Sequence, residues 1–255
     1  MSMKLAFSDF DGTLCIDGVV PEENLQAIKA WQAAGNKFGI ATGRGYRAIL
    51  PEIERHHIPV DFMVCTNGSS VYDAQGKLLQ AQTIPQATVT ALLQSQHVTD
   101  YTGGLLFFTT TQACMYNGAQ MLPPELFRAL GSVAEATELP DMLQVGMEFP
   151  DQEQTLAAFA ALDADFPKTF AGNINRRFLD INIYGTAKDQ GILALARRLQ
   201  VPEQDIWAIG DDRNDLPMLR RFGSHGCCVA RAKEYMHEAA GCVYDSVGAM
   251  LYDNL

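Results

Sequence analysis

The sequence predicts an α/β fold in which a core of parallel strands is interrupted by a second, smaller α/β unit. Short apolar runs alternate with helical patterns over residues 5–68, which is the rhythm of βαβ units and of a parallel sheet. This rhythm is lost in the middle of the chain and returns near its C-terminal end. We therefore expect residues 1–82 and 186–255 to form the core and residues 83–185 to form an inserted unit.

The composition is that of a globular protein without a membrane span. The chain has 255 residues, 47% of them hydrophobic, and a mean hydropathy of −0.04, and it contains no run of 18 apolar residues. A formal net charge of −11 argues against nucleic acids and membrane surfaces as partners. No apolar signal segment precedes the first strand and the six cysteines form no Cys-x-x-Cys pair, so we expect free thiols and a cytoplasmic location. No obligate protein partner is evident.

The first strand carries the most informative motif of the chain. Its apolar residues end in Asp9-Phe10-Asp11-Gly12-Thr13. Residues two apart on a strand point the same way, so Asp9 and Asp11 are expected side by side, with Phe10 in the core. Gly12 permits a tight turn. Paired carboxylates suit Mg²⁺ and the division of work between a nucleophile and a general acid, although an Asp-rich turn has the same composition.

The next segments repeat the strand and helix alternation. A helix is predicted from Pro21, which is typical of a first turn, to Gly35, which is typical of a helix end. Apolar runs predict strands at 37–41 and 62–65, with a helix at 46–57 between them. Polar residues follow these two strands, namely Thr42, Gly43 and Arg44 after the first and Asn67 after the second.

The inserted unit mixes strands, helices and an Asn-Gly turn. Strands are predicted at 104–111, 113–116, 142–149 and 177–184, and helices at 85–96, 123–131 and 152–163. A unit of this size joined to the core by two connections can move as a lid, and a closed lid would admit only small substrates.

The core pattern then resumes. A helix is predicted at 186–199, with Lys188 near its start, and an apolar strand at 206–209 runs into the sequence GDDRND at 210–215. The remaining elements are helices at 216–222 and 233–240 and strands at 227–229 and 242–244.

Six chemically active side chains therefore stand at strand exits or helix starts: Asp9, Asp11, Thr42, Lys188, Asp211 and Asp215. Each alone has an ordinary explanation, as a turn residue, a helix cap or an exposed lysine. Ligand sites of parallel sheets lie beyond the carboxyl ends of the strands, so the set predicts one shared site.

With these motifs in this order, the sequence resembles the haloacid dehalogenase (HAD) superfamily, in particular its Cof-like phosphatases. The resemblance covers nearly the whole chain, and it implies a Rossmann-like parallel-sheet core with an inserted α/β cap domain. It implies that Asp9 is the nucleophile and Asp11 the general acid and base. Thr42 would bind the phosphoryl oxygens, and Lys188 would neutralise the nucleophile and the phosphate.

The resemblance also implies a magnesium cofactor and a set of substrate contacts. The metal would be held by Asp9, Asp11 (through its backbone carbonyl), Asp211 and Asp215. The substrate and its phosphate would be bound by Phe10, Gly12, Gly43, Arg44, Asn67, Asn214 and Arg176. The implied function is Mg²⁺-dependent hydrolysis of small phosphorylated metabolites, such as sugar phosphates, through an aspartyl-phosphate intermediate.

Two alternatives stay open at this point. A phosphotransferase or phosphomutase would use the same residues with another acceptor. A phospho-accepting module of receiver type also uses acidic residues, Thr and Lys. By resemblance, however, such modules are about half as long as this chain and lack an Asp two residues after the phosphoacceptor, like Asp11.

Two stretches leave the role of a residue undecided. Ala230-Arg231-Ala232 stands where the family often has Gly-Asn-Ala, so Arg231 is either a substitute cation or a surface residue. Substrate contacts within the cap are sought among Asn173, Asn175, Arg176 and Arg177.

Overall fold

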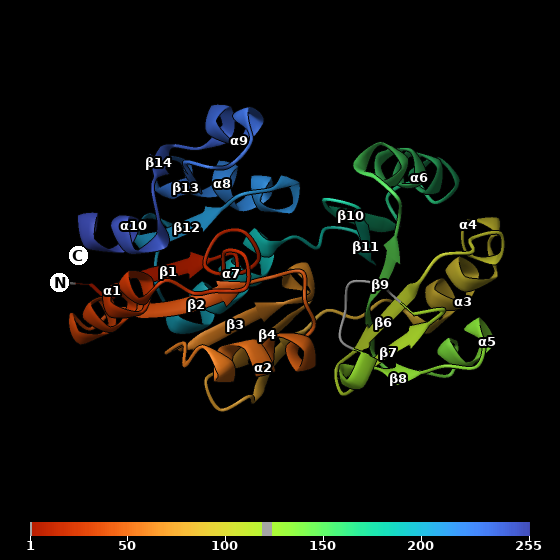
Figure 1. Cartoon of the computed structure of the whole chain (residues 1–255). Coiled ribbons are helices and arrows are strands. Elements are labelled where there is room, and N and C mark those ends of the chain that lie inside the picture. Colours follow the sequence, from red (N-terminus) through yellow and green to blue (C-terminus); the bar gives the residue numbers. More distant parts are fainter. Residues whose placement is uncertain (1, 119–123) are drawn as a thin grey trace.

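The computed structural model describes residues 2–118 and 124–255, and it contains two β-sheets, each covered by helices (Figure 1). The chain therefore has the predicted α/β fold with a parallel-rich central sheet. We call residues 2–82 and 186–255 the core and residues 83–118 and 124–185 the cap. This division follows the boundaries expected from the sequence, which stay a prediction.

The core sheet has the strand order β14-β13-β12-β1-β2-β3-β4-β5. Its strands are β1 (Leu5–Ser8), β2 (Lys37–Ala41), β3 (Phe62–Cys65), β4 (Ser70–Asp73), β5 (Leu78–Ala81), β12 (Ile206–Gly210), β13 (Gly226–Val229) and β14 (Cys242–Tyr244). The strands from β14 to β3 pair in parallel. Only β4 pairs antiparallel with its neighbours, which are β3 and β5. The first strand thus lies in the middle of the sheet, between β12 and β2.

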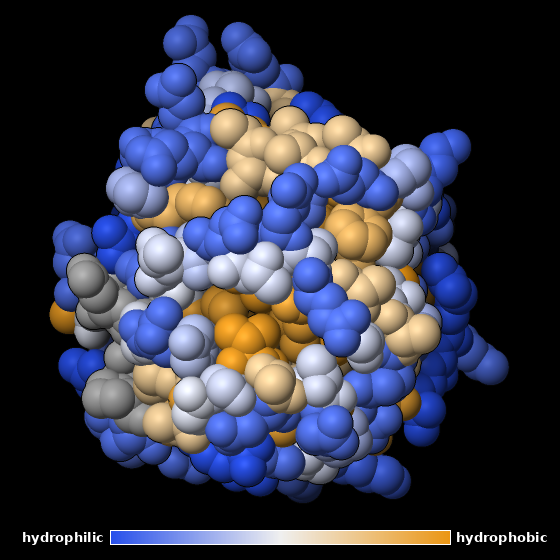
Figure 2. Space-filling model, turned by 90° about the vertical axis from the view of Figure 1, so that its right-hand side faces the viewer, coloured by the Kyte–Doolittle hydropathy of each residue, from blue (hydrophilic) through white to orange (hydrophobic). Residues whose placement is uncertain are grey.

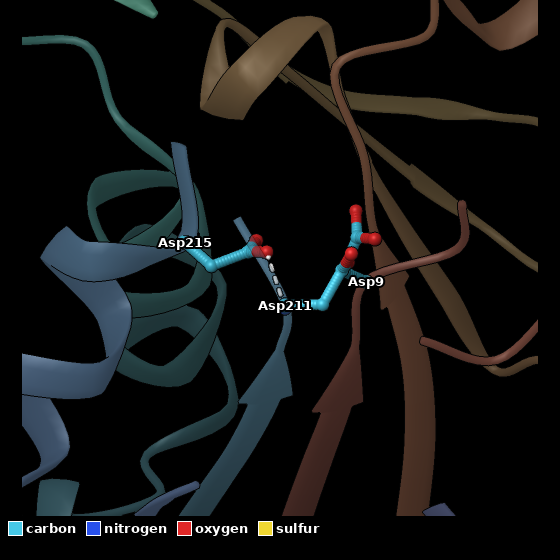
Figure 3. A group of neighbouring side chains, drawn as sticks. All are labelled: Asp9, Asp211 and Asp215. Carbon is cyan, nitrogen blue, oxygen red and sulfur yellow. Dashed lines mark hydrogen bonds between the residues drawn. The ribbon is translucent and has the colours of Figure 1, made fainter. Parts of the chain in front are cut away.

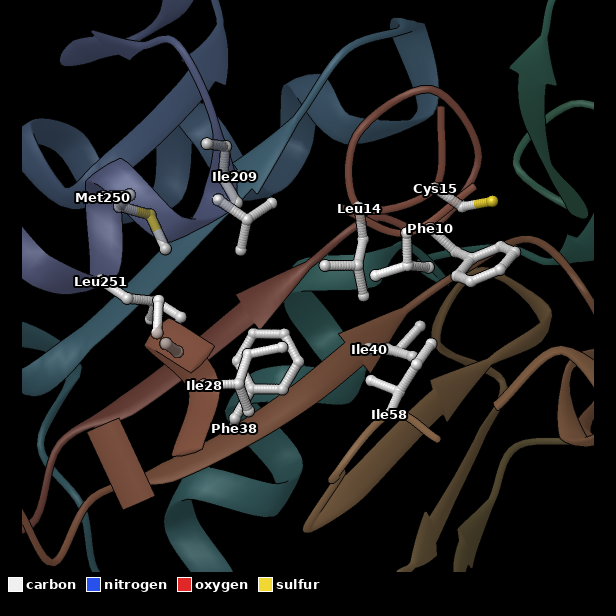
Figure 4. Packing of buried hydrophobic residues seen from close by; sticks show 14 of the residues in the cluster. Phe10, Leu14, Cys15, Ile28, Phe38, Ile40, Ile58, Ile209, Met250 and Leu251 are labelled. Atoms are coloured by element: carbon white, nitrogen blue, oxygen red, sulfur yellow. The ribbon is translucent and has the colours of Figure 1, made fainter. Parts of the chain in front are cut away.

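Helices cover both faces of the core sheet. One face packs against α1 (Glu22–Ala33), α2 (Tyr46–Arg55) and α10 (Val247–Asp253), and the other against α7 (Lys188–Leu199), α8 (Leu216–Phe222) and α9 (Glu234–Ala239). Figure 4 shows the first of these layers, in which Ile28 of α1, Met250 of α10 and Phe38 of β2 belong to one buried hydrophobic cluster. Burying these side chains removes apolar surface from water, which stabilises the sheet beneath them.

The cap sheet has the strand order β10-β11-β9-β6-β7-β8. Its strands are β6 (Leu105–Thr109), β7 (Ala113–Tyr116), β8 (Arg128–Ala129), β9 (Met142–Glu148), β10 (Phe170–Asn175) and β11 (Phe178–Ile183). The cap helices are α3 (Gln86–Gln94), α4 (Gln96–Thr99), α5 (Val133–Ala136) and α6 (Gln152–Asp165).

The two faces of the cap sheet differ, because side chains alternate along each strand. Leu105 and Phe107 of β6 pack with the cap helices in one cluster. Leu106 and Phe108 of the same strand pack with Ala48 of the core helix α2 in another. One face of the cap sheet therefore faces its own helices, and the other faces the core.

The helical side of the cap is the right-hand side of Figure 1, where α3, α4, α5 and α6 lie. Figure 2 views the molecule from this side and shows hydrophobic residues at the bottom of a recess that hydrophilic residues surround. Among the described residues, none of the helices has both the length and the apolar character that a bilayer crossing requires.

Most predicted elements are confirmed, but the helix expected at 123–131 is wrong. Residues 124–126 form a single 3₁₀ turn, and Arg128–Ala129 form β8, which pairs in parallel with β7. Residue 123 lies outside the described residues. Apolar residues three and four apart suggested a helix here, but Phe127 packs instead against Phe108 of the cap sheet. The strands β4, β5 and β10 and the helices α5 and α10 were not predicted.

Candidate active site

Three of the predicted site residues meet at one edge of the core sheet. Asp9 follows β1, Thr42 follows β2, and Asp211 follows β12. These strands are neighbours in register, with Ser8 beside both Ile40 and Ile209. Their carboxyl ends therefore present the three polar residues together, as expected for a parallel sheet.

A cluster of three carboxylates forms the centre of this edge (Figure 3). Asp9, Asp211 and Asp215 each offer an oxygen atom, and these atoms lie within 4.8 Å of one another. Asp215 is positioned by its Oδ2 atom, which accepts hydrogen bonds from the backbone N–H groups of Asp211 (2.9 Å) and Asp212 (3.2 Å). Lys188, the first residue of α7, donates from Nζ to Asp9 at 2.5 Å and to Asp215 at 2.6 Å.

This cluster contains more acidic groups than basic ones. Burial raises the pKa of Asp9 well above its usual range, against the opposing effect of Lys188, and the neighbouring acids Asp215 and Asp211 raise it further. Burial and Asp215 raise the pKa of Asp211 to about 6. Burial disfavours the charged form of Lys188, but the two carboxylates outweigh it and raise the ammonium pKa above its ordinary value. One ammonium cannot neutralise three carboxylates.

The donor set fits a hard divalent cation. Carboxylate oxygens are the ligands that Mg²⁺ prefers, and a cation among them would relieve the repulsion that helps to raise the pKa values of Asp9 and Asp211. Asp11 is not a member of this group of three, because its side chain points elsewhere.

Asp11 pairs with Arg44. Arg44 donates from Nε to Asp11 Oδ2 at 2.8 Å and from Nη2 to Oδ1 at 2.7 Å, which is a bidentate ion pair. The Arg44 guanidinium also lies over the buried Phe10 ring, 5.4 Å from its centre, so a cation–π contact helps to hold it. The carboxylate of Asp11 is therefore fixed in orientation.

The loop after β1 is tightly constrained. Gly12 has φ of +92°, and a Cβ atom there would lie 2.5 Å from Asp211 Oδ2, so only glycine fits. Arg231 donates from Nε to the Gly12 carbonyl at 2.9 Å and from Nη2 to the Thr13 carbonyl at 3.2 Å. Arg231 is exposed, and these two hydrogen bonds hold the loop in place.

Thr42 and Gly43 begin the loop after β2. Thr42 is buried, and its Oγ1 atom accepts a hydrogen bond from the Arg44 backbone N–H at 3.1 Å. A Cβ atom on Gly43 would lie 2.9 Å from Asp180 Oδ2, so the absence of a side chain lets the cap approach closely.

Asn67 and Asn214 belong to a buried network that joins core and cap. Asn214 donates to Asn67 Oδ1 at 3.2 Å, and Asn67 donates to Asp180 Oδ2 at 2.8 Å and to Gln144 Oε1 at 3.2 Å. Asp180 lies on β11 and Gln144 on β9. Sequence reasoning missed both cap residues, although a charged residue inside the apolar strand pattern around Ile181 was a signal for the first.

The cap residues proposed as contacts lie in different places. Asn173 is buried and donates to Asn182 Oδ1 at 2.9 Å, away from the site. Arg177 pairs with Glu148. The backbone N–H of Arg176 donates to Asp212 Oδ2 at 3.2 Å, which brings the turn between β10 and β11 against the core.

A cavity of about 620 Å³ lies between core and cap. Asp11, Thr42 and Gly43 line its core side, and Gln144 and Asp180 line it from the cap sheet. Its volume is that of a site for a small molecule. Because residues of the core and of the cap line this cavity, a ligand here would touch both parts of the chain.

The pKa of Asp180 yields a testable result on stability. Burial raises this pKa to about 7, against the hydrogen bond from Asn67, whereas an unfolded Asp titrates near pH 4. The group's contribution to stability is fully present below pH 4 and is lost as the pH rises through 7. We expect Asp180→Asn to remove this loss, which amounts to roughly 2–4 kcal/mol of the free energy of unfolding.

Urea denaturation at pH 4.5, 6 and 7.5 measures this effect. The matched control is Asp163→Asn on the exposed side of α6, whose curve should follow that of the wild type. Parallel pH dependence in Asp180→Asn and wild type would show that Asp180 ionises without cost.

Comparisons with known proteins agree with this geometry. The family model of haloacid dehalogenase-like hydrolases matches residues 6–248. HMP-PP phosphatase of Serratia proteamaculans is 27% identical over 241 residues, covering 90% of this chain and 84% of that protein. Phosphatase YwpJ of Bacillus subtilis is 25% identical over 281 residues, covering 94% of each chain. A solved haloacid dehalogenase-like hydrolase from B. subtilis shares the fold with a TM-score of 0.84, at 21% identity and with 99% of this chain and 100% of that chain covered.

Proposed function

Since this chain belongs to the haloacid dehalogenase-like hydrolase family, we propose that it hydrolyses small phosphate monoesters with Mg²⁺, through a phosphoryl group carried on Asp9. It is a phosphatase, as are its relatives over nearly the whole of its length. The observation that carries the proposal is the group formed by Asp9, Asp211 and Asp215 together with Lys188, in a chain whose cavity is lined by the nearby residues Asp11 and Thr42. The six cysteines are free thiols, which supports the expected cytoplasmic location.

Asp9 acts as the nucleophile in this proposal. Its carboxylate oxygen forms a bond to phosphorus while the bond from phosphorus to the alcohol oxygen breaks. A phosphate monoester carries nearly two negative charges, so Asp9 needs positive charge beside it. Lys188 supplies that charge at 2.5 Å from Asp9. Water then attacks the aspartyl-phosphate and releases inorganic phosphate.

Asp9, Asp211 and Asp215 would hold the metal. When bound, Mg²⁺ neutralises charge on the carboxylates and on the phosphoryl oxygens. Thr42 Oγ1 already accepts a hydrogen bond from Arg44, so its own proton is available to a phosphoryl oxygen.

Asp11 acts as the acid and then as the base. Its proton goes to the alcohol oxygen as that bond breaks, and it later accepts a proton from the attacking water. Both oxygens of Asp11 accept from Arg44 in this structure, so Asp11 must leave this ion pair to take up the proton that it gives to the alcohol oxygen. Asp11 and Arg44 both lie on the wall of the cavity, where a leaving group would lie.

Replacing the acid should give a loss that depends on the leaving group. Asp11→Asn is expected to slow hydrolysis of an alkyl phosphate by roughly 10²- to 10⁴-fold, the usual contribution of a general acid. The loss should shrink for p-nitrophenyl phosphate, because p-nitrophenolate leaves without a proton. Steady-state kcat for both esters checks this, and equal losses would assign Asp11 a role other than protonation.

A panel of esters tests the function itself. Inorganic phosphate is measured from p-nitrophenyl phosphate and several hexose phosphates, with Mg²⁺ and with EDTA, and its release distinguishes hydrolysis from transfer to another acceptor. Asp211→Asn should raise the Mg²⁺ concentration needed for half-maximal activity by tenfold or more, since one carboxylate ligand is lost. Asp17→Asn, an exposed residue of the neighbouring loop, is the control. Full activity in EDTA would reject the metal.

A further inference from the structure

The cap side of the cavity has an apolar wall. Leu106, Phe108, Phe127 and Phe178 line it, and they come from three separate segments of the cap. Phe108 and Phe127 meet edge to face, with ring centroids 5.8 Å apart and an angle of 71° between the rings. Both rings are largely buried, so their positions are set by packing and the wall exists before a ligand enters.

This wall offers no hydrogen-bond partner to the hydroxyl groups of a sugar. A hexose carries hydroxyl groups around the edge of its ring, and each one that is turned toward the wall loses water without gaining a partner, which costs free energy. Aromatic and aliphatic side chains offer no such partner. A flat apolar ring loses little on entering, and it gains edge-to-face or stacked contacts with the phenylalanines.

Two polar groups stand at the edge of the wall, on the neighbouring strands β9 and β11. Gln144 Nε2 donates to the Gly43 carbonyl at 3.2 Å, so its amide is fixed. Asp180 Oδ2 accepts from Asn67, whereas Asp180 Oδ1 receives no hydrogen bond from residues 2–118 or 124–255. This oxygen lines the cavity and can accept an N–H or O–H from a ligand.

Gly146 lies between the polar and the apolar part of this surface. It pairs with Asp180 on one side and with Leu106 on the other. A Cβ atom there would lie 3.2 Å from Leu106 Cβ and 3.4 Å from Asp180 Oδ1, so no side chain rises between the two. The surface from Asp180 to Phe108 is therefore flat at its centre.

We propose that the organic part of the substrate is a planar aromatic or heteroaromatic ring, bound against Leu106, Phe108, Phe127 and Phe178 with a polar edge toward Asp180. The inference rests on the proposed function, because it names the leaving group of that reaction. The phosphate lies on the core side of the cavity, at Asp11 and Thr42.

Three esters of matched shape test the proposal. Benzyl phosphate, cyclohexylmethyl phosphate and glucose 6-phosphate each carry a six-membered ring on a phosphorylated methylene group. We expect kcat/KM for benzyl phosphate to exceed that for glucose 6-phosphate by at least tenfold, with cyclohexylmethyl phosphate between them. Equal or better activity on glucose 6-phosphate would overturn the proposal.

A pair of variants on β6 assigns the preference to the wall. Phe108→Leu should lower kcat/KM for benzyl phosphate roughly 3- to 10-fold and leave glucose 6-phosphate within about twofold. Phe107→Leu is the matched control, because it makes the same change on the opposite face of the same strand and should leave the ratio of the two esters unchanged. If Phe108→Leu does not fold, Phe178→Leu at the half-buried edge of the wall replaces it. Equal losses for all three esters would contradict the assignment.

Binding separates this inference from the function on which it rests. In Asp9→Asn, calorimetric titration should give a lower dissociation constant for benzyl phosphate than for glucose 6-phosphate, whether or not the wild type turns either over. No turnover by the wild type together with this preference would reject the phosphatase mechanism and keep the ring site. Turnover of all three esters without a preference would keep the phosphatase mechanism and reject the ring site.

Discussion

Asp9→Asn is expected to lower phosphate release by on the order of 10⁴-fold or more while the protein stays folded. An amide has the shape of the carboxylate but is a poor nucleophile, so the covalent step is lost. Its Oδ1 atom can still accept the hydrogen bond from Lys188. Burial and nearby acids raise the pKa of Asp9, so a neutral group at this position removes repulsion and the free energy of unfolding should not fall.

Initial rates of phosphate release and urea denaturation measure the two halves of this result. Asp17→Asn makes the same chemical change on an exposed residue of the same loop and should keep wild-type rates. Near wild-type turnover by Asp9→Asn of verified mass would remove Asp9 from the role of nucleophile.

Lys188→Met should show the second large effect, on stability and on activity together. Lys188 is fully buried and bonded to Asp9 and Asp215, so its removal leaves two buried carboxylates without their cation. Breaking a buried ion pair from one side costs about 3–5 kcal/mol of the free energy of unfolding. Turnover should fall by roughly 10²- to 10³-fold, because a fixed charge at the phosphoryl group is lost.

Lys37→Met is the matched control for this substitution. Lys37 pairs with Asp61 at 2.9 Å, but its side chain is 44% exposed, so the change should cost less than about 1 kcal/mol. Both losses of the free energy of unfolding are measured by urea denaturation without metal. Equal losses in the two variants would contradict the expectation that a buried ion pair costs more to break than an exposed one.

The core and its site could be predicted because their signals are local. Asp9, Thr42 and Asp211 each follow an apolar run directly, and the topology of parallel strands then brings them together. The hairpin of β4 and β5 was missed because Leu78–Ala81 is an exposed edge strand with little apolar pattern. The helix α10 was missed although Ser246 caps it, accepting from the Ala249 N–H at 3.1 Å.

The apolar wall on the cap side of the site could not be predicted from the sequence, because its residues carry no local signal. Phe107 and Phe108 look alike in the sequence, and only the pairing of β6 with its neighbours decides which face each one takes. Arg231 likewise acquires its role from contacts with carbonyl groups some 218 residues earlier in the chain. Such contacts follow from tertiary structure and leave no periodic pattern.

The central place of β1 in its sheet sets the order in which this protein can be completed during synthesis. Leu5–Ser8 needs β12 as one of its two neighbours, and β12 ends only at Gly210. Until then one edge of β1 stays open, and open edges of apolar strands are sites of association with other chains. All pairings of the cap sheet, in contrast, lie between Leu105 and Ile183, so they can form earlier on the ribosome. A chain interrupted before residue 206 thus holds Asp9 but lacks Asp211 and Asp215, so under the proposed mechanism it would not hydrolyse phosphate esters until its synthesis is nearly finished.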